Sequence, residues 1–229
     1  MQDVSTKAEG AVVLLSGGLD SATVLQIAKS HGYSLIALSF DYGQRHKFEL
    51  ERARELAIRA NAKHLVLRID QELFKNTALV PGGPAVPEKR QIDDSIPVTY
   101  VPARNILFLS HALAVCESND IGNIFIGVNA LDYSGYPDCR PEFIQAFEQM
   151  AALGMKRGVE GRPIIIHAPL MQWNKARIIQ EGMKLGVDYS RTSSCYQPSA
   201  SGKPCGLCDS CVLREKGFAE AGLIDPLKS

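Results

Sequence analysis

The segment Ser16–Ser21, with the sequence SGGLDS, could bind phosphate because of its residue types and its place in the chain. It follows an apolar run, Ala11–Leu15, and precedes a segment with helical spacing. Glycine lets the backbone approach a ligand closely, and the free N–H groups and dipole at a helix start attract anions. An acidic side chain in such a loop suits a triphosphate screened by Mg²⁺, so we expect Asp20 beside that ion. Neither GxxxxGK(S/T) nor GxGxxG is present, and a plain strand-to-helix turn is the alternative.

Four cysteines have the spacing of a metal site, Cys195-x9-Cys205-x2-Cys208-x2-Cys211. Four thiolates from one short loop can hold a tetrahedral Zn²⁺ ion without much fold around them. A site closed by four protein ligands leaves no position for water, so we expect one structural zinc ion per chain. Four unrelated reduced thiols are the alternative.

Three more polar segments each follow an expected strand or open an expected helix: 39–46, 101–105 and 127–140. Together they suggest one site with aromatic faces and fixed polar groups, suited to a planar heterocycle. His46 could act there as a general base, although a surface histidine is an equal alternative. Lys175 opens a helix, where its charge opposes the helix dipole. We therefore expect Lys175 to face phosphate, with a solvated lysine as the alternative.

The elements that must position these residues alternate along the chain. Apolar and β-branched runs predict strands, and helical spacing predicts the helices between them. This alternation predicts an α/β fold with a doubly wound, mainly parallel sheet, whose ligands bind at the carboxyl ends of the strands. The strands are expected at 11–15, 34–40, 64–69, 124–126 and 164–166, and the helices at 20–31, 47–60, 105–116, 142–156 and 174–185.

Composition narrows the class of protein. The chain is 45% hydrophobic and 22% charged, as in ordinary soluble globular proteins. Lysine plus arginine and aspartate plus glutamate number 25 each, so no broad basic face for nucleic acid is expected. We see no secretion signal and no apolar run long enough to span a membrane, and we expect a cytoplasmic protein.

Two segments depart from the regular alternation. The loop 71–101 contains six prolines and glycines in irregular positions, which indicates a mobile lid or a disordered insertion. As a lid it could keep water from a reactive intermediate. From Arg191 onward the composition shifts to Ser, Cys, Gly and Pro. We therefore predict two units, 1–190 and 191–229.

SGGLDS between a strand and a helix resembles the PP-loop of the N-type ATP pyrophosphatases. Over nearly the whole chain the sequence resembles the 7-cyano-7-deazaguanine synthases of the queuosine pathway, in the motifs VLLSGGLDS, SFDYGQRH, VPARN, GVNALDYSGYPDCRPEF and SSCY…PCGLCDSC. The resemblance implies an adenine nucleotide alpha hydrolase-like fold with a small C-terminal zinc unit of four cysteine ligands. It also implies conversion of 7-carboxy-7-deazaguanine, ammonia and ATP to the 7-cyano compound by a homodimer.

The resemblance also implies roles for individual residues. The ATP loop would comprise Leu14, Leu15, Ser16, Gly17, Gly18, Leu19, Asp20, Ser21, Ala22, Thr23 and Val24. The resemblance also implies substrate contacts from Asn129, Asp132, Tyr133, Asp138 and Arg140, and zinc ligands at Cys195, Cys205, Cys208 and Cys211. From their own positions in the chain, Arg104 and Asn105 are expected to contact substrate, and Asp20, Lys175 and His46 to be catalytic.

Other functions stay open at this point. Another PP-loop ATPase, such as a tRNA thiolase or an amide-forming synthetase, is the first alternative. Zero net charge argues against a tRNA substrate, and the lack of a glutaminase-like segment indicates that ammonia arrives free. A zinc ribbon that binds nucleic acid is the second alternative, but Lys203, Arg214 and Lys216 are too few for a basic patch, and it leaves SGGLDS unexplained. Whether ADP or AMP is released is not decided by these motifs.

Overall fold

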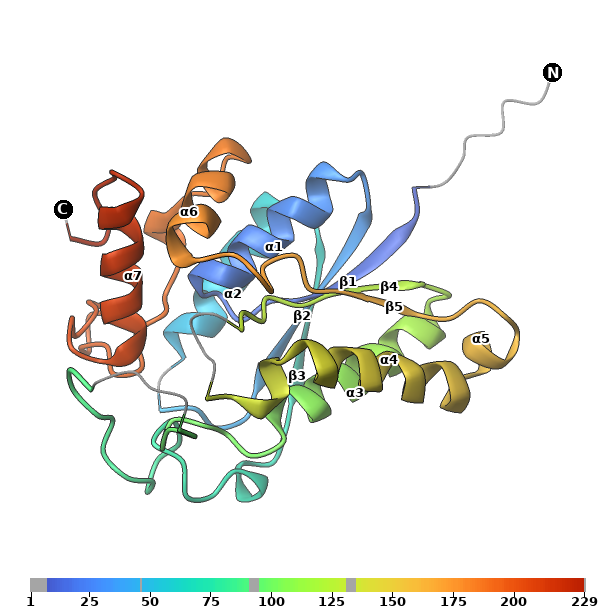
Figure 1. The fold of residues 1–229 in the computed structure, drawn as a ribbon, viewed down its shortest axis with the longest axis horizontal. Coiled ribbons are helices and arrows are strands. Elements are labelled where there is room, and N and C mark those ends of the chain that lie inside the picture. The colour runs from blue at the N-terminus through green and yellow to red at the C-terminus, as the bar shows by residue number, and fades with distance from the viewer. Residues whose placement is uncertain (1–7, 46, 91–94, 131–134, 229) are drawn as a thin grey trace.

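A parallel sheet forms the centre of the molecule, which is represented by a computed structural model describing residues 8–45, 47–90, 95–130 and 135–228. In these residues the sheet has five strands in the order β3-β2-β1-β4-β5, and all neighbouring strands are parallel (Figure 1). The predicted doubly wound α/β fold is confirmed. The strands are β1 (Gly10–Leu14), β2 (Ser34–Asp41), β3 (Lys63–Arg68), β4 (Asn123–Phe125) and β5 (Ile165–His167).

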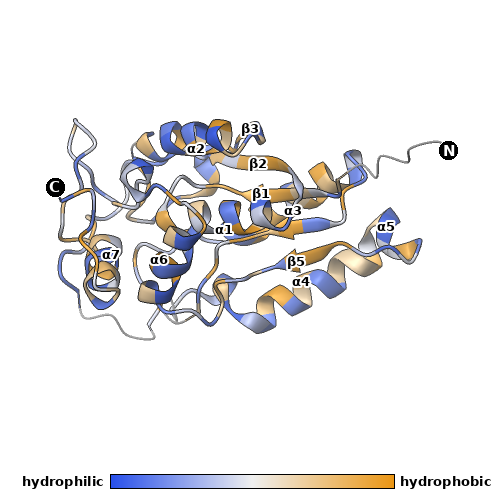
Figure 2. Cartoon of the chain, turned by 90° about the horizontal axis from the view of Figure 1, so that it is seen from above, coloured by the Kyte–Doolittle hydropathy of each residue, from blue (hydrophilic) through white to orange (hydrophobic). Residues whose placement is uncertain are grey.

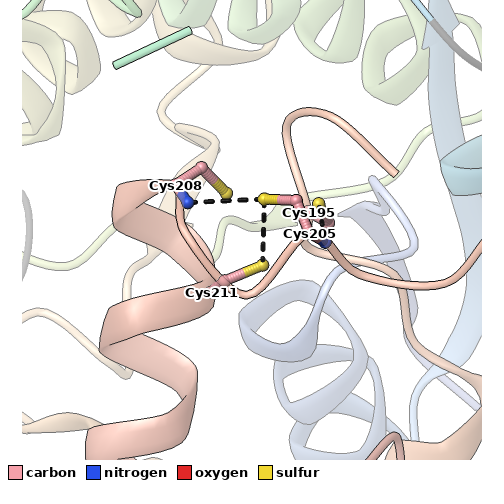
Figure 3. Close-up of side chains that lie close together, drawn as sticks. All are labelled: Cys195, Cys205, Cys208 and Cys211. Carbon is pink, nitrogen blue, oxygen red and sulfur yellow. Dashed lines mark hydrogen bonds between the residues drawn. The ribbon is translucent and has the colours of Figure 1, made fainter. Parts of the chain in front are cut away.

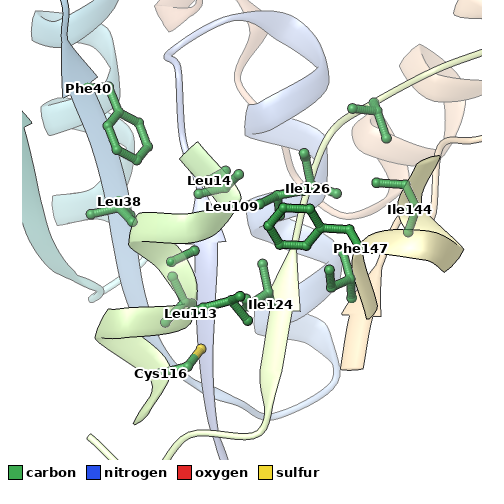
Figure 4. Close-up of a cluster of buried hydrophobic side chains, with 14 of the residues drawn as sticks. Leu14, Leu38, Phe40, Leu109, Leu113, Cys116, Ile124, Ile126, Ile144 and Phe147 are labelled. Carbon is green, nitrogen blue, oxygen red and sulfur yellow. The ribbon is translucent and has the colours of Figure 1, made fainter. Parts of the chain in front are cut away.

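Each face of the sheet is covered because successive side chains of a strand point to opposite faces. In β1, Val12 and Leu14 pack with α3 (Arg104–Ser118) and α4 (Pro141–Gly154), as Figure 4 shows for Leu14. Ala11 and Val13 pack on the other face with α1 (Leu19–Ser30) and α2 (Phe48–Arg59). The central strand β1 is therefore apolar on both faces and lies between helices with polar outer surfaces (Figure 2).

The direction of winding changes between β1 and β4. From β1 the chain runs outward to β2 and β3, and it then crosses back through α3 to β4 and β5 on the other side. The loops that follow the neighbouring strands β1 and β4 therefore lead to helices on opposite faces of the sheet, α1 and α4, at a switch point where parallel sheets commonly bind ligands. The loops that follow β1 and β4 are Ser16–Ser21 and the segment beginning at Gly127.

The predicted helix at 142–156 is divided. Helix α4 ends at Gly154, Met155 has an extended backbone, and a short α5 (Lys156–Val159) follows. A helix at the C-terminal end was not predicted. There α7 (Asp209–Glu220) packs against α6 (Lys175–Lys184), which in turn packs on α1. Its buried face includes Arg214, and a charged residue in the buried stripe hides the apolar pattern.

The described parts of the loop at 71–101 contain one short 3-10 helix (Gln71–Leu73) and otherwise irregular backbone. They are packed rather than detached from the molecule. The Arg45 guanidinium donates to the carbonyls of Ala78, Gly83 and Pro84 at 2.7–3.1 Å, and the Thr99 hydroxyl bonds the Tyr136 hydroxyl at 2.7 Å. The alternative of a disordered insertion does not hold for these described parts, and motion as a lid stays a prediction.

Candidate active site at the carboxyl ends of β1 and β4

Serine hydroxyls hold the loop between β1 and α1. The Ser21 hydroxyl accepts from the backbone N–H groups of Ser16 and Gly17, both at 3.2 Å, and donates to the Gly18 carbonyl at 3.0 Å. Gly18, the N-cap residue of α1, supplies no capping side chain of its own. This helix end lines a cavity, where its N–H groups and dipole favour an anion.

Gly17 is required by two features of its surroundings. Its φ is +90°, a conformation that other residues rarely adopt. A Cβ atom there would also lie 2.1 Å from the carbonyl oxygen of Glu49, in the backbone of α2. The phosphate-type loop is therefore pressed directly against the first turn of α2.

Asp20 and Lys175 form a buried ion pair beside this loop. The ammonium group lies 2.8 and 2.9 Å from the two carboxylate oxygens, although the residues are 155 positions apart. The side chains are 7% exposed for Lys175 and 19% for Asp20. Asp20 lines the cavity, and Lys175 lies behind it with its aliphatic chain against Gly217 of α7. Lys175 thus holds the carboxylate of a cavity residue and does not itself line the cavity, and its contact with phosphate stays a prediction.

The cavity encloses about 230 Å³ next to the loop. Phe40 and Phe108 stack in its wall with ring centroids 3.9 Å apart, and Tyr42 and Tyr136 also line it. A cavity with an aromatic wall and a few fixed polar groups is suited to a planar heterocycle. The predicted site residues that line it are Leu14, Leu15, Ser16, Gly18, Leu19, Asp20, Ser21, Arg104, Asn105 and Asn129.

Asp138 and Arg140 do not line the cavity. Asp138 is buried behind Asn105, whose backbone N–H donates to the Asp138 carboxylate at 3.0 Å and whose side-chain amide donates to the Asp138 carbonyl at 3.0 Å. This pair fixes the start of α3. Arg140 is exposed and directly precedes α4. Predictions for His46, Asp132 and Tyr133 lie outside the described residues.

Asn129 holds the neighbouring segment in place. Its side-chain amide donates to the Leu170 carbonyl at 3.1 Å and to the carbonyl of Trp173. The segment after β5, which leads to Lys175, is thereby tied to the segment after β4. Asn129 thus orders the wall of the cavity as well as lining it.

Arg104 and Glu49 supply opposite charges to the cavity wall. Burial lowers the pKa of Arg104, but Tyr42 and Asp138 raise it more, so the guanidinium stays charged. Burial raises the pKa of Glu49 to about 7, an effect that the charge of Arg104 partly offsets. Glu49 was not predicted as a site residue. Acidic residues are common in the first turn of a helix because they interact favourably with its dipole, so the sequence does not distinguish Glu49 from a surface residue.

The C-terminal residues complete one wall. Ser194, Tyr196 and Ser210 line the cavity, and the Ser194 hydroxyl accepts from the N–H of Leu19 at 3.2 Å. The N–H of Ser193 also donates to the Gly17 carbonyl at 2.9 Å. None of these contacts could be expected from sequence, because the partners lie some 175 residues apart and only the tertiary fold brings their segments together.

The four cysteines come together as predicted. Their sulfur atoms all lie within 4.8 Å of one another, and the side chains point toward a common centre (Figure 3). A tetrahedral zinc ion with Zn–S distances of about 2.3 Å requires sulfur atoms about 3.8 Å apart, and the sulfur atoms of Cys205 and Cys211 are 3.9 Å apart. Backbone N–H groups of Gln197, Leu207 and Cys208 donate to the sulfurs. The donor set therefore fits a closed metal site.

The cysteine cluster is joined to the described part of the loop at 71–101. The N–H of Lys89 donates to the Leu207 carbonyl at 2.8 Å, and the Arg90 guanidinium lies 3.1 Å from the Asp209 carboxylate. Ala78 and Val86 pack against the cysteines themselves. A metal ion bound by the cysteines would therefore stabilise the C-terminal segment that forms this wall of the cavity.

Comparison with known proteins identifies the family. The model of "Queuosine biosynthesis protein QueC" matches residues 10–222. The chain belongs to this family. Similar proteins include the 7-cyano-7-deazaguanine synthase of Kineococcus radiotolerans, 58% identical over 95% of this chain and 96% of the relative. That of Desulfatibacillum aliphaticivorans is 60% identical over 96% of both chains.

Solved structures with a similar fold are more distant than these QueC relatives. NMN synthetase from Francisella tularensis has a TM-score of 0.50 at 18% identity, over 95% of this chain and 79% of that chain. The U34-tRNA thiolase NcsA from Methanococcus maripaludis has a TM-score of 0.50 at 12% identity, over 98% and 76%. At such identities the likeness concerns the fold alone, and it agrees with the predicted adenine nucleotide alpha hydrolase-like class.

In the part of the chain that the structure describes, no helix is long and apolar enough to cross a bilayer.

Proposed function

We propose that this QueC-family chain is a 7-cyano-7-deazaguanine synthase, an ATP-dependent ligase that forms carbon–nitrogen bonds in queuosine biosynthesis. Its substrates are 7-carboxy-7-deazaguanine, ammonia and ATP. The observation that carries the proposal is 58% identity to a relative of that name over nearly the full length of both chains. The cavity beside the glycine loop supports it, because nucleotide and heterocycle can meet there.

The chemistry explains why ATP is required. A carboxylate is a poor electrophile, because its leaving group would be oxide. Transfer of a nucleotide or phosphate group to one oxygen makes that oxygen a good leaving group. Ammonia then displaces it to give an amide, and loss of the second oxygen gives the nitrile. No side chain has to form a covalent bond with the substrate, so catalysis depends on positioning the reactants and stabilising the charge that develops.

The geometry supports separate roles for the charged residues. The loop Leu14–Val24 binds ATP, and Asp20 contacts the Mg²⁺ ion of the triphosphate while Lys175 holds its carboxylate in place. Arg104, a permanent cation in the cavity wall, faces the substrate carboxylate. The heterocycle is bound by Asn105 and Asn129, and Asp138 holds Asn105 in place. Contacts from Asp132, Tyr133 and Arg140 and proton transfer by His46 stay predictions.

The C-terminal unit, 191–229, is proposed to hold one structural zinc ion through its four cysteines. The ion would keep the cysteine loop folded and leave no ligand position for substrate. Metal analysis of the purified protein tests this, with one zinc ion expected per chain.

We also propose that the protein is a cytoplasmic homodimer that binds neither nucleic acid nor membrane. Sedimentation would test the dimer, and salt-dependent oligonucleotide binding would test the absence of nucleic-acid binding.

The proposed substrate is tested by nucleotide consumption. The protein is incubated with ATP, Mg²⁺ and ammonium together with 7-carboxy-7-deazaguanine, an unrelated aromatic carboxylate, or tRNA. Consumption of ATP with the deazaguanine acid alone is expected. ATP consumption with tRNA or with the unrelated acid instead would contradict the proposed substrate and would indicate the substrate of another PP-loop ATPase.

A further inference from the structure

Glu49 presents an uncommitted carboxylate to the cavity. It lies in the first turn of α2, which is pressed against the glycine loop at Gly17. The side chain is partly buried and lines the cavity together with Asp20 and Arg104. Within the described residues, no hydrogen-bond donor reaches this carboxylate.

The other carboxylates nearby are committed to structural bonds. Asp20 accepts both of its bonds from Lys175, and Asp138 accepts from the N–H of Asn105. A partly buried carboxylate that lacks a hydrogen-bond donor is harder to keep ionised than one in water. A carboxylate kept in such an environment at a cavity is often functional, and exchange of protons with a ligand is one function that it can have.

The titratable groups that line the cavity with Glu49 come from five parts of the chain. They are Asp20 of α1, Tyr42 after β2, Arg104 of α3, Tyr136 and Cys139 of the segment before α4, and Tyr196 of the C-terminal segment. Burial raises the pKa of Tyr42, Tyr136 and Cys139, so these three stay protonated near neutral pH. Arg104 stays protonated as well. Burial raises the pKa of Glu49 to about 7, where a carboxylate exchanges protons readily.

The proposed reaction, on which this inference rests, needs a proton acceptor. Ammonia carries three hydrogen atoms and the nitrogen of a nitrile carries none, so three protons must leave. We propose that Glu49 is the base that accepts protons from this nitrogen. Its position next to the loop places it where the activated carboxylate and the nucleotide phosphate meet.

In the amide-forming step, the nitrogen lone pair of ammonia forms the C–N bond to the activated acyl carbon. The C–O bond to the nucleotide-derived phosphate breaks, and its electron pair leaves with that oxygen. The proton released from nitrogen passes to the Glu49 carboxylate, and the resulting carboxylic acid returns it to solvent. A second ATP then transfers its phosphate or nucleotide group to the amide oxygen. The C–O bond to that oxygen breaks with its electron pair on the oxygen, and the same carboxylate takes the remaining two N–H protons, one at a time, while the N–H electron pairs form the new C–N bonds of the nitrile.

The variant Glu49→Gln tests the proposal, with Glu51→Gln as the matched control. Glu51 is in the same turn of α2 but exposed, so its change alters the helix charge equally. We expect Glu49→Gln to slow nitrile formation about 100-fold or more. Exchange into ATP of labelled pyrophosphate, if the acid is adenylated, or of labelled ADP, if it is phosphorylated, should persist in the presence of 7-carboxy-7-deazaguanine, because activating the acid requires no proton from nitrogen. Glu51→Gln should match the unmodified protein in both assays.

A pH profile separates a proton acceptor from a residue that only shapes the cavity. At constant free ammonia, nitrile formation by the unmodified protein should rise with an apparent pKa of about 7, because Glu49 accepts a proton only when ionised. Glu49→Gln should lose this rise. Glu49→Asp should keep it while lowering the rate about tenfold, since a shorter carboxylate remains a base.

Several outcomes would overturn the inference. One is nitrile formation by Glu49→Gln at the unmodified rate, and another is an unchanged pH profile in that variant. Loss of exchange and nitrile together in both Glu49→Gln and Glu49→Asp would make Glu49 a binding or structural residue instead. If the unmodified protein shows neither exchange nor nitrile, the proposed function itself fails, and that result is distinct from any difference between variants.

Discussion

At the scale of single residues, Gly17 and Gly18 differ sharply in what they tolerate. Gly17 has φ +90° and a backbone atom of α2 2.1 Å from the place of a Cβ, whereas a Cβ at Gly18 would meet nothing closer than 3.4 Å. Gly17→Ala is expected to cost about 2 kcal/mol or more of unfolding free energy, and Gly18→Ala less than about 1 kcal/mol. Urea unfolding measures both, and equal costs would contradict the contact between the loop and α2.

The buried pair of Asp20 and Lys175 predicts an asymmetric double-mutant cycle. Asp20→Ala leaves an ammonium group that is 7% exposed without its carboxylate, which should cost about 3 kcal/mol. Lys175→Met leaves a carboxylate that is 19% exposed and should cost less. The double variant is expected to be more stable than Asp20→Ala alone, as measured by urea unfolding. Additive losses would show that the two residues do not stabilise each other.

At the scale of elements, a buried ion pair anchors α7. Arg214 of α7 bonds the carboxylate of Asp225 at 2.7 and 2.9 Å, and it also donates to the Thr192 hydroxyl and the Tyr189 carbonyl. Asp225→Ala should therefore cost about 3 kcal/mol of unfolding free energy. The control is Glu215→Ala, whose pair with Lys228 is about half exposed and should change stability by less than about 0.5 kcal/mol. Similar losses in both variants would contradict an anchoring role.

Elements with a local pattern could be predicted, and those decided by distant contacts could not. The strands and the first helices follow from apolar runs and helical spacing along the chain. Helix α7 was missed because its buried stripe contains Arg214, which is compensated only by Asp225 beyond the helix end. The division of the predicted helix at 142–156 depends on Met155, whose residue type does not end a helix.

At the scale of the whole molecule, the site is assembled from parts that the chain places far apart. The glycine loop and the cysteine cluster could be found from sequence because each is complete within a short segment. Pairing of Asp20 with Lys175, and closure of the wall by Ser194 and Tyr196, depend on the tertiary fold. Glu49 carries no motif, and only its position against the loop and Arg104 distinguishes it from the other acidic residues of α2.

The measurement that tests the proposed reaction most directly is mass spectrometry of the base and nucleotide after one incubation. The protein is given ATP, Mg²⁺, ¹⁵N-labelled ammonium and 7-carboxy-7-deazaguanine. The expected product is the 7-cyano compound with one ¹⁵N atom and both carboxyl oxygens lost, and the appearance of AMP or ADP decides the activation chemistry. ATP consumption without labelled nitrile, or no turnover of either substrate, would contradict the proposed function.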